Sequence, residues 1–88
     1  SDDPQVAAAQ YFGTKGFFTS YDASLDLPVT EAVKTVWEKG FADLQKGMLE
    51  PMLLAKAVYA AEAKRSSSTN QKRGDFLQAL FSRLAEPR

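Results

Sequence analysis

The strongest structural signal in the chain is the stretch TEAVKTVWEKGFADL, residues 30–44. Its apolar side chains recur every three or four residues, the spacing of one face of an α-helix: Val33, Val36, Trp37, Phe41 and Leu44. Thr30 is a suitable N-cap residue, because its hydroxyl can accept a hydrogen bond from a first-turn amide. Gly40 lies on the apolar face and lets a second helix approach closely, and Gly47 is a natural stop. The stretch therefore predicts an amphipathic helix over residues 30–46.

Three further helices are predicted around this one. Asp3 and Pro4 form a cap and a first-turn proline, which start a helix over residues 4–13. Pro51 starts a helix over residues 51–65, whose apolar positions fall on two adjoining faces: Met52, Ala55 and Val58 or Tyr59 on one, and Leu54, Val58 and Ala61 on the other. The last helix, over residues 73–85, is predicted from one apolar stripe: Phe76, Leu77, Leu80, Phe81 and Leu84.

The segments between these helices carry no convincing strand pattern. Residues 13–28 combine glycines, aromatics and turn-forming Ser and Asp residues, which predicts one long, ordered, aromatic-rich loop. Residues 66–71 are a polar run that predicts a short linker. We therefore expect a single all-α domain over residues 1–88, either a four-helix bundle or an orthogonal helical array.

Composition excludes several kinds of chemistry. The 88 residues include no cysteine and no histidine, so disulfides, thiolate nucleophiles, the commonest general base and the commonest transition-metal ligand are all missing. Eleven basic and eleven acidic residues give zero net charge, so we do not expect nucleic acid as a partner. No apolar stretch approaches the roughly 20 residues that cross a bilayer. We expect no membrane span, no bound cofactor and no metal.

The zero net charge hides an asymmetry between the two halves of the chain. Residues 1–44 hold seven acids and three bases, a charge of −4, whereas residues 45–88 hold four acids and eight bases, a charge of +4. One interpretation is attraction between the halves of the folded domain. The other is a basic face for a polyanion or another domain, and its candidate residues flank the polar linker: Lys64, Arg65, Lys72 and Arg73.

An aromatic cluster is the most distinctive local feature. Five aromatic residues fall within eleven positions: Tyr11, Phe12, Phe17, Phe18 and Tyr21. One interpretation is a small core that closes the long loop against the first two helices. In the other, Tyr11, Phe17, Phe18 and Tyr21 form a contact surface for a partner domain or a sugar ring.

No group of residues forms a convincing catalytic or ligand-binding motif. Asp22 and Asp26 are the nearest approach to paired carboxylates, but turn and cap roles explain them. The GTKG tetrapeptide, residues 13–16, has neither of the usual phosphate-loop spacings and follows a helix instead of opening one. Ser66 to Ser68 lack a base that would activate them. The tripeptide RGD, residues 73–75, falls at a helix start, where Asp75 would serve as a cap.

Two resemblances follow from the longer patterns. Ala8, Tyr11, Gly16, Phe17, Tyr21 and Asp22, followed by Leu27 to Ala32, resemble the S-layer homology motif, in which a helix and a Tyr-containing loop precede a Pro- and Thr-marked helix start. The stretch Lys72 to Leu77 is similar to a second such start, although the Asp-Gly-x-Phe turn and an Arg after Thr30 are missing. This resemblance implies a module that binds cell-wall or other polysaccharide.

The second resemblance is to the helical C-terminal region of bacterial FAD-dependent oxidoreductases of the xanthan lyase-like kind. It rests on Tyr11, Gly16, Phe17, Phe18, Tyr21, Ala23, Leu27 and Pro28. It implies a non-catalytic accessory domain that packs against a parent domain or another protein, with the flavin site elsewhere in the parent. Because the chain begins at Ser1, we expect a processed or excised piece of a longer protein. Either resemblance implies an extracytoplasmic or cell-envelope location.

Overall fold

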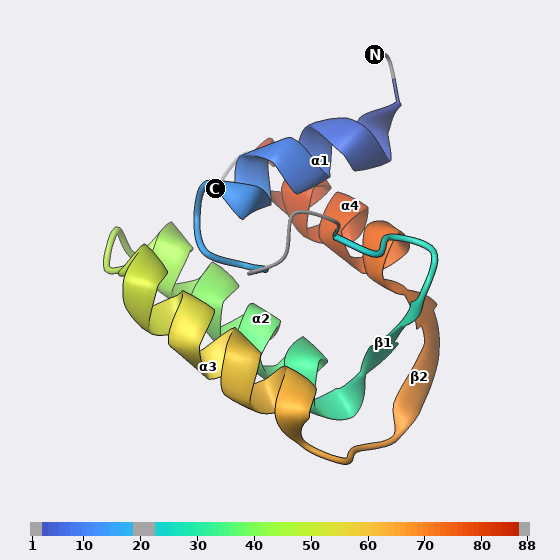
Figure 1. The fold of residues 1–88 in the computed structure, drawn as a ribbon. Helices are drawn as coiled ribbons and strands as arrows, with labels where there is room; N and C mark the ends of the chain where they lie inside the picture. Colours follow the sequence, from blue (N-terminus) through green and yellow to red (C-terminus); the bar gives the residue numbers. More distant parts are fainter. Residues whose placement is uncertain (1–2, 19–22, 87–88) are drawn as a thin grey trace.

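The chain folds into two successive helix–strand–helix halves. The computed structural model describes residues 3–18 and 23–86 (Figure 1). In chain order its elements are α1 (Pro4–Gly13), β1 (Pro28–Thr30), α2 (Glu31–Gln45), α3 (Pro51–Ala63), β2 (Ser68–Lys72) and α4 (Arg73–Leu84). The first half is α1–β1–α2 and the second is α3–β2–α4.

The helices begin where the sequence signals place them. The Oδ1 atom of Asp3 accepts a hydrogen bond from the Gln5 amide at 2.9 Å, and the Thr30 hydroxyl accepts one from the Val33 amide at 3.3 Å. α1 has the predicted bounds, whereas α2, α3 and α4 end one or two residues before the predicted ones. Asp75 does not cap α4: its Oδ1 atom accepts a hydrogen bond from the Gln5 side-chain amide at 2.6 Å, so it joins α4 to α1.

The prediction of an all-α fold is wrong, because the two halves are joined by a two-stranded antiparallel sheet. β1 pairs with β2 so that Pro28 faces Lys72 and Thr30 faces Ser68. Most of the predicted linker over residues 66–71 is therefore strand β2. The domain is a small mixed α/β fold with four helices and two strands in its described residues.

Each of these strands lacks the pattern that usually marks a strand. β1 has only three residues and begins with a proline, and β2, of sequence STNQK, contains no apolar residue. Pairing instead relies on the backbone, on burial of Val29 and on one side-chain contact across the sheet. In that contact the Thr69 hydroxyl donates a hydrogen bond to the carbonyl oxygen of Val29 at 2.7 Å.

The helices form two packed pairs, which the sheet joins on one side (Figure 1). α1 packs on α4, and α2 packs on α3. One buried cluster fills the space between the pairs, and Trp37 is its largest member. Its other members are Ala8, Phe12, Phe17, Val29, Val33, Phe41, Leu54, Val58, Ala61, Phe76, Leu77 and Leu80. A single core of this kind agrees with the apolar stripes of α2 and α4.

Two glycines allow backbone to pack closely around α3. A Cβ atom on Gly40 would lie 2.9 Å from the methyl carbons of Leu54, so the predicted close approach of a second helix to α2 is confirmed, and that helix is α3. Gly16 has a φ of +87°, and a Cβ atom there would clash with the carbonyl oxygen of Pro51. The segment after α1 is thereby held against the start of α3.

Candidate functional site

The aromatic cluster lies mostly inside the core. Phe12 and Phe17 are fully buried, with ring centroids 4.5 Å apart. Tyr11 and Phe18 are half-buried and pack against the same core. The centroid of the Tyr11 ring lies 5.5 Å from that of Phe81 in α4. Phe17 therefore has no surface to offer a partner, and Tyr11 and Phe18 expose only part of their side chains. Tyr21, the fourth candidate contact residue, lies outside the described residues.

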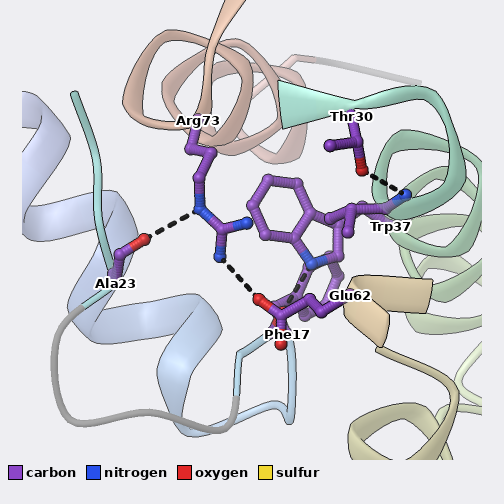
Figure 2. A network of polar contacts seen from close by, with 7 residues as sticks. Phe17, Ala23, Thr30, Trp37, Glu62 and Arg73 are labelled. Carbon is purple, nitrogen blue, oxygen red and sulfur yellow. Dashed lines mark hydrogen bonds and ion pairs between the residues drawn. The ribbon is translucent and has the colours of Figure 1, made fainter. Parts of the chain in front are cut away.

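A buried arginine forms the main polar network of the domain (Figure 2). The Nε atom of Arg73 donates a hydrogen bond to the carbonyl oxygen of Ala23 at 2.9 Å, and its Nη2 atom lies 3.4 Å from the Glu62 Oε2 atom. The guanidinium carbon lies 4.9 Å from the centroid of the Trp37 ring, within cation–π distance. The Trp37 indole N–H donates to the carbonyl oxygen of Phe17. The network thus ties both ends of the loop between α1 and β1 to the core.

The charged form of Arg73 is disfavoured by its burial and favoured by its partner Glu62. Burial lowers the pKa of Arg73 below its ordinary value, because desolvation disfavours the charged form, while the charge and hydrogen bond of Glu62 act in the opposite direction. The reference pKa of a guanidinium is so high that the group stays protonated at physiological pH. Arg73 is therefore a permanent buried cation with three structural partners.

The basic patch predicted around the linker does not form as a group of four. Lys64, Arg65 and Lys72 are exposed, but Arg73 turns inward to Trp37. The RGD tripeptide is not presented either, because Arg73 and Gly74 are both buried. Lys39–Asp43 and Arg73–Glu62, two ion pairs between described residues, each join residues of the same half of the chain.

The remaining candidate groups have structural roles. Asp26 is exposed, and Asp22 lies outside the described residues. Within residues 3–18 and 23–86, no three His, Cys, Asp or Glu side chains are grouped so that they could hold a metal ion. The amides of residues 14–16 donate to carbonyl oxygens of residues 11–13, so the GTKG turn closes α1. The Ser66 hydroxyl accepts a hydrogen bond from the Ala32 amide at 3.3 Å, which caps α2.

The structure reveals one surface that the sequence motifs do not mark, the solvent side of α3. Only one face of α3 is buried, the face with Leu54, Val58 and Ala61. The helix and the turn before it leave four large apolar side chains exposed to solvent. Their exposed fractions are 68% for Met48, 78% for Met52, 57% for Leu53 and 70% for Tyr59. Between Pro51 and Ala61 only Lys56 is charged. We call the exposed residues Met52, Leu53, Lys56, Tyr59, Ala60 and Ala63 the α3 outer face.

An apolar groove adjoins this face between α2 and α3. It has a volume of about 340 Å³, and its apolar lining includes Val36, Met48, Leu53 and Ala57. Gly40 and Leu54 are also among its lining residues, and the Leu54 methyl groups pack against Gly40. On its α2 side the Lys39 ammonium lies 3.2 Å from the Asp43 carboxylate. The groove extends the apolar surface of the α3 outer face toward α2.

A sequence signal for the α3 outer face does exist. The helix PMLLAKAVYAAEA has two charged residues in thirteen, whereas α2 has five in fifteen. A helix that is apolar on every side has more apolar surface than one core contact can bury. The two adjoining apolar faces noted in the sequence are thus one core face, with Leu54, Val58 and Ala61, and one solvent face, with Met52 and Tyr59.

Comparisons of the chain with protein-family models, with curated proteins and with solved structures give no match. In the part of the chain that the structure describes, none of the helices has the length and apolar character needed to cross a membrane. The assignment of a function therefore rests on the geometry of the chain's own residues.

Proposed function

We propose that this chain is a non-catalytic interaction domain, and that the α3 outer face is its contact surface. The resemblance to xanthan lyase-like FAD-dependent oxidoreductases supports a role for the chain as an accessory domain of a larger bacterial enzyme. The observation that carries the proposal is the exposure of Met52, Leu53 and Tyr59 along one side of a helix that has almost no charge there.

The energetics of α3 support a contact role. Contiguous apolar surface exposed to water is costly, and in folded proteins it marks sites of protein or ligand contact. The core does not need these residues, because the opposite face of α3 already buries Leu54 and Val58 in the core cluster. The exposed positions are also rich in methionine and tyrosine, side chains that adapt well to a partner surface.

The experiment compares two variants, Met52→Lys and Tyr59→Asp, in the isolated chain and in the longer protein that the resemblance implies. Both side chains are exposed, so the free energy of unfolding of the isolated chain should change by less than about 0.5 kcal/mol. In the longer protein, each variant should lower the melting temperature by about 3 °C or more, because the contact loses apolar burial and gains a charge.

A matched control separates a contact role from a general effect of added charge. Leu27 is 58% exposed and lies before β1, outside α3. Leu27→Asp should leave the melting temperature of the longer protein unchanged. If the α3 variants behave like Leu27→Asp in the longer protein, the α3 outer face is not a contact surface and the proposal fails.

A second candidate function is binding to cell-wall polysaccharide, which the resemblance to the S-layer homology motif implies. One observation favours it: two stretches of the resemblance each lead through strand residues into a helix, since Leu27 to Ala32 contains β1 and the start of α2, and Lys72 to Leu77 runs from the last residue of β2 into α4. Co-sedimentation of the chain with purified cell-wall polysaccharide tests it. Retention that soluble polysaccharide competes away supports this function, and passage without retention refutes it.

A further inference from the structure

We propose that the α3 outer face binds a second copy of this chain, with the two α3 helices antiparallel about a two-fold axis near Ala57. This inference rests on the proposed contact role of the α3 outer face and names its partner. A symmetric pair needs a face that is complementary to itself, so that residue i of one copy meets residue j of the other and the reverse. Two features of α3 meet this requirement, and a third sets the strength of the pair.

The first feature is the distribution of apolar residues along the face. Met52, Lys56, Tyr59 and Ala63 succeed one another at spacings of three and four residues, so they lie in one row along the helix. In an antiparallel pair centred near Ala57, Met52 lies beside Ala63 of the second copy, a large residue against a small one. Lys56 then lies beside Tyr59 of the second copy, where its ammonium can sit over the ring.

The second feature is the charge at the two ends of α3. Glu50 precedes the helix, and Lys64 and Arg65 follow it, all three exposed. Within residues 3–18 and 23–86, none of these three side chains makes an ion pair. Antiparallel pairing places Glu50 beside Arg65 of the second copy, and symmetry repeats this contact at the other end. It also opposes the two helix dipoles, and the zero net charge of the chain adds no overall repulsion.

The third feature is the size of the surface, which sets the strength of the pair. With its flanking residues, α3 is about 24 Å long and a helix is about 10 Å wide, so its face covers roughly 240 Å². Met48 and the groove beside Leu53 extend it, but the total stays below the roughly 800 Å² per partner of a standard stable interface. The pair is therefore weak, with a dissociation constant on the order of 100 μM.

Sedimentation velocity and sedimentation equilibrium test the pair with the chain itself. Between about 10 μM and about 1 mM, the mass should rise from that of a monomer toward that of a dimer. Tyr59→Asp acts twice in a symmetric dimer, so it should raise the dissociation constant by on the order of 100-fold. Leu27→Asp is the matched control and should leave the dissociation constant unchanged. Circular dichroism verifies that each variant is folded, and Met52→Lys replaces Tyr59→Asp if the latter does not fold.

Reversal of the end charges tests the antiparallel orientation. Glu50→Arg and Arg65→Glu should each raise the dissociation constant by about fivefold, and the double variant should restore it. Equal weakening in the double variant refutes this orientation. A chain that stays monomeric at all concentrations, or a Leu27→Asp variant that weakens the dimer as much as Tyr59→Asp, refutes the pairing itself. A monomeric chain whose α3 variants still destabilise the longer protein leaves the proposed function standing and only the pairing refuted.

Discussion

Replacement of Arg73 by methionine tests whether the buried network of Figure 2 holds the domain together. Methionine is apolar and unbranched, so it can follow much of the arginine stem over the Trp37 ring. It removes the hydrogen bond to the carbonyl oxygen of Ala23, the ion pair with Glu62 and the cation–π contact with Trp37. The substitution therefore removes all three interactions at once and leaves the core filled.

The magnitude follows from the burial of each partner. The charge-assisted bond to Ala23 is worth about 2 kcal/mol, because the carbonyl oxygen is left buried without a donor. The cation–π contact adds about 1 kcal/mol. The ion pair adds only about 0.5 kcal/mol, because the Glu62 side chain is 35% exposed and water screens it. Relief from the desolvation of the guanidinium offsets part of this sum. We expect Arg73→Met to lower the free energy of unfolding by about 2 kcal/mol.

Urea unfolding followed by two probes measures this change. The chain has a single tryptophan, Trp37, so its fluorescence reports on the network itself, and far-ultraviolet circular dichroism reports on the helices. For a domain of this size, about 2 kcal/mol corresponds to a fall in the melting temperature of about 8–16 °C. Glu62→Gln is the matched control, since it removes only the charge of the exposed partner and should cost about 0.5 kcal/mol. A loss below about 0.5 kcal/mol for Arg73→Met would refute the structural role of the network.

Two further substitutions test local geometry by the same unfolding measurement. Gly16→Ala places a methyl group against the Pro51 carbonyl at a positive φ, so it should cost about 3 kcal/mol, whereas Gly47→Ala, also at a positive φ but with nothing within 4 Å, should cost only about 1 kcal/mol. Equal costs would contradict the close contact. Ser66→Ala removes the acceptor of the Ala32 amide and should cost about 1 kcal/mol, and no change would mean that water replaces it.

The helices could be predicted from the sequence because their signals are local. Apolar spacing, the Asp3 and Thr30 caps and the first-turn prolines Pro4 and Pro51 depend only on neighbouring residues, and the structure uses each of them. The end of α2 also has a local signal: Gly47, at a φ of +71°, donates its amide to the Leu44 carbonyl oxygen at 3.1 Å, and the Met48 amide donates to that of Asp43 at 2.8 Å. The ends of α3 and α4 were less predictable, because no glycine cap follows them.

The strands could not be predicted because their signal is not local. Residues 68–72 contain no apolar side chain and read as a linker, and they become a strand only because Val29 and its neighbours lie beside them in the folded chain. Arg73 shows the same limit for the candidate site. In the sequence it belongs to a run of basic residues, but its position at the first turn of α4 points its side chain at Trp37, 36 residues earlier. The apolar composition of α3 could be predicted from the sequence. Which of its sides faces the core could not, because that depends on where α2 packs.

The contacts between the halves explain why such a small core suffices. The first amides of a helix need acceptors from outside it. The Glu31 amide at the start of α2 donates to the carbonyl oxygen of Ser67, at 2.8 Å, and the Arg73 amide at the start of α4 donates to that of Leu27, also at 2.8 Å. Each half therefore supplies the acceptor that the second helix of the other half needs. Because the Glu31 and Arg73 amides find their acceptors in the other half, the halves stabilise each other and should fold as one cooperative unit. The outer side of α3 takes no part in these two contacts.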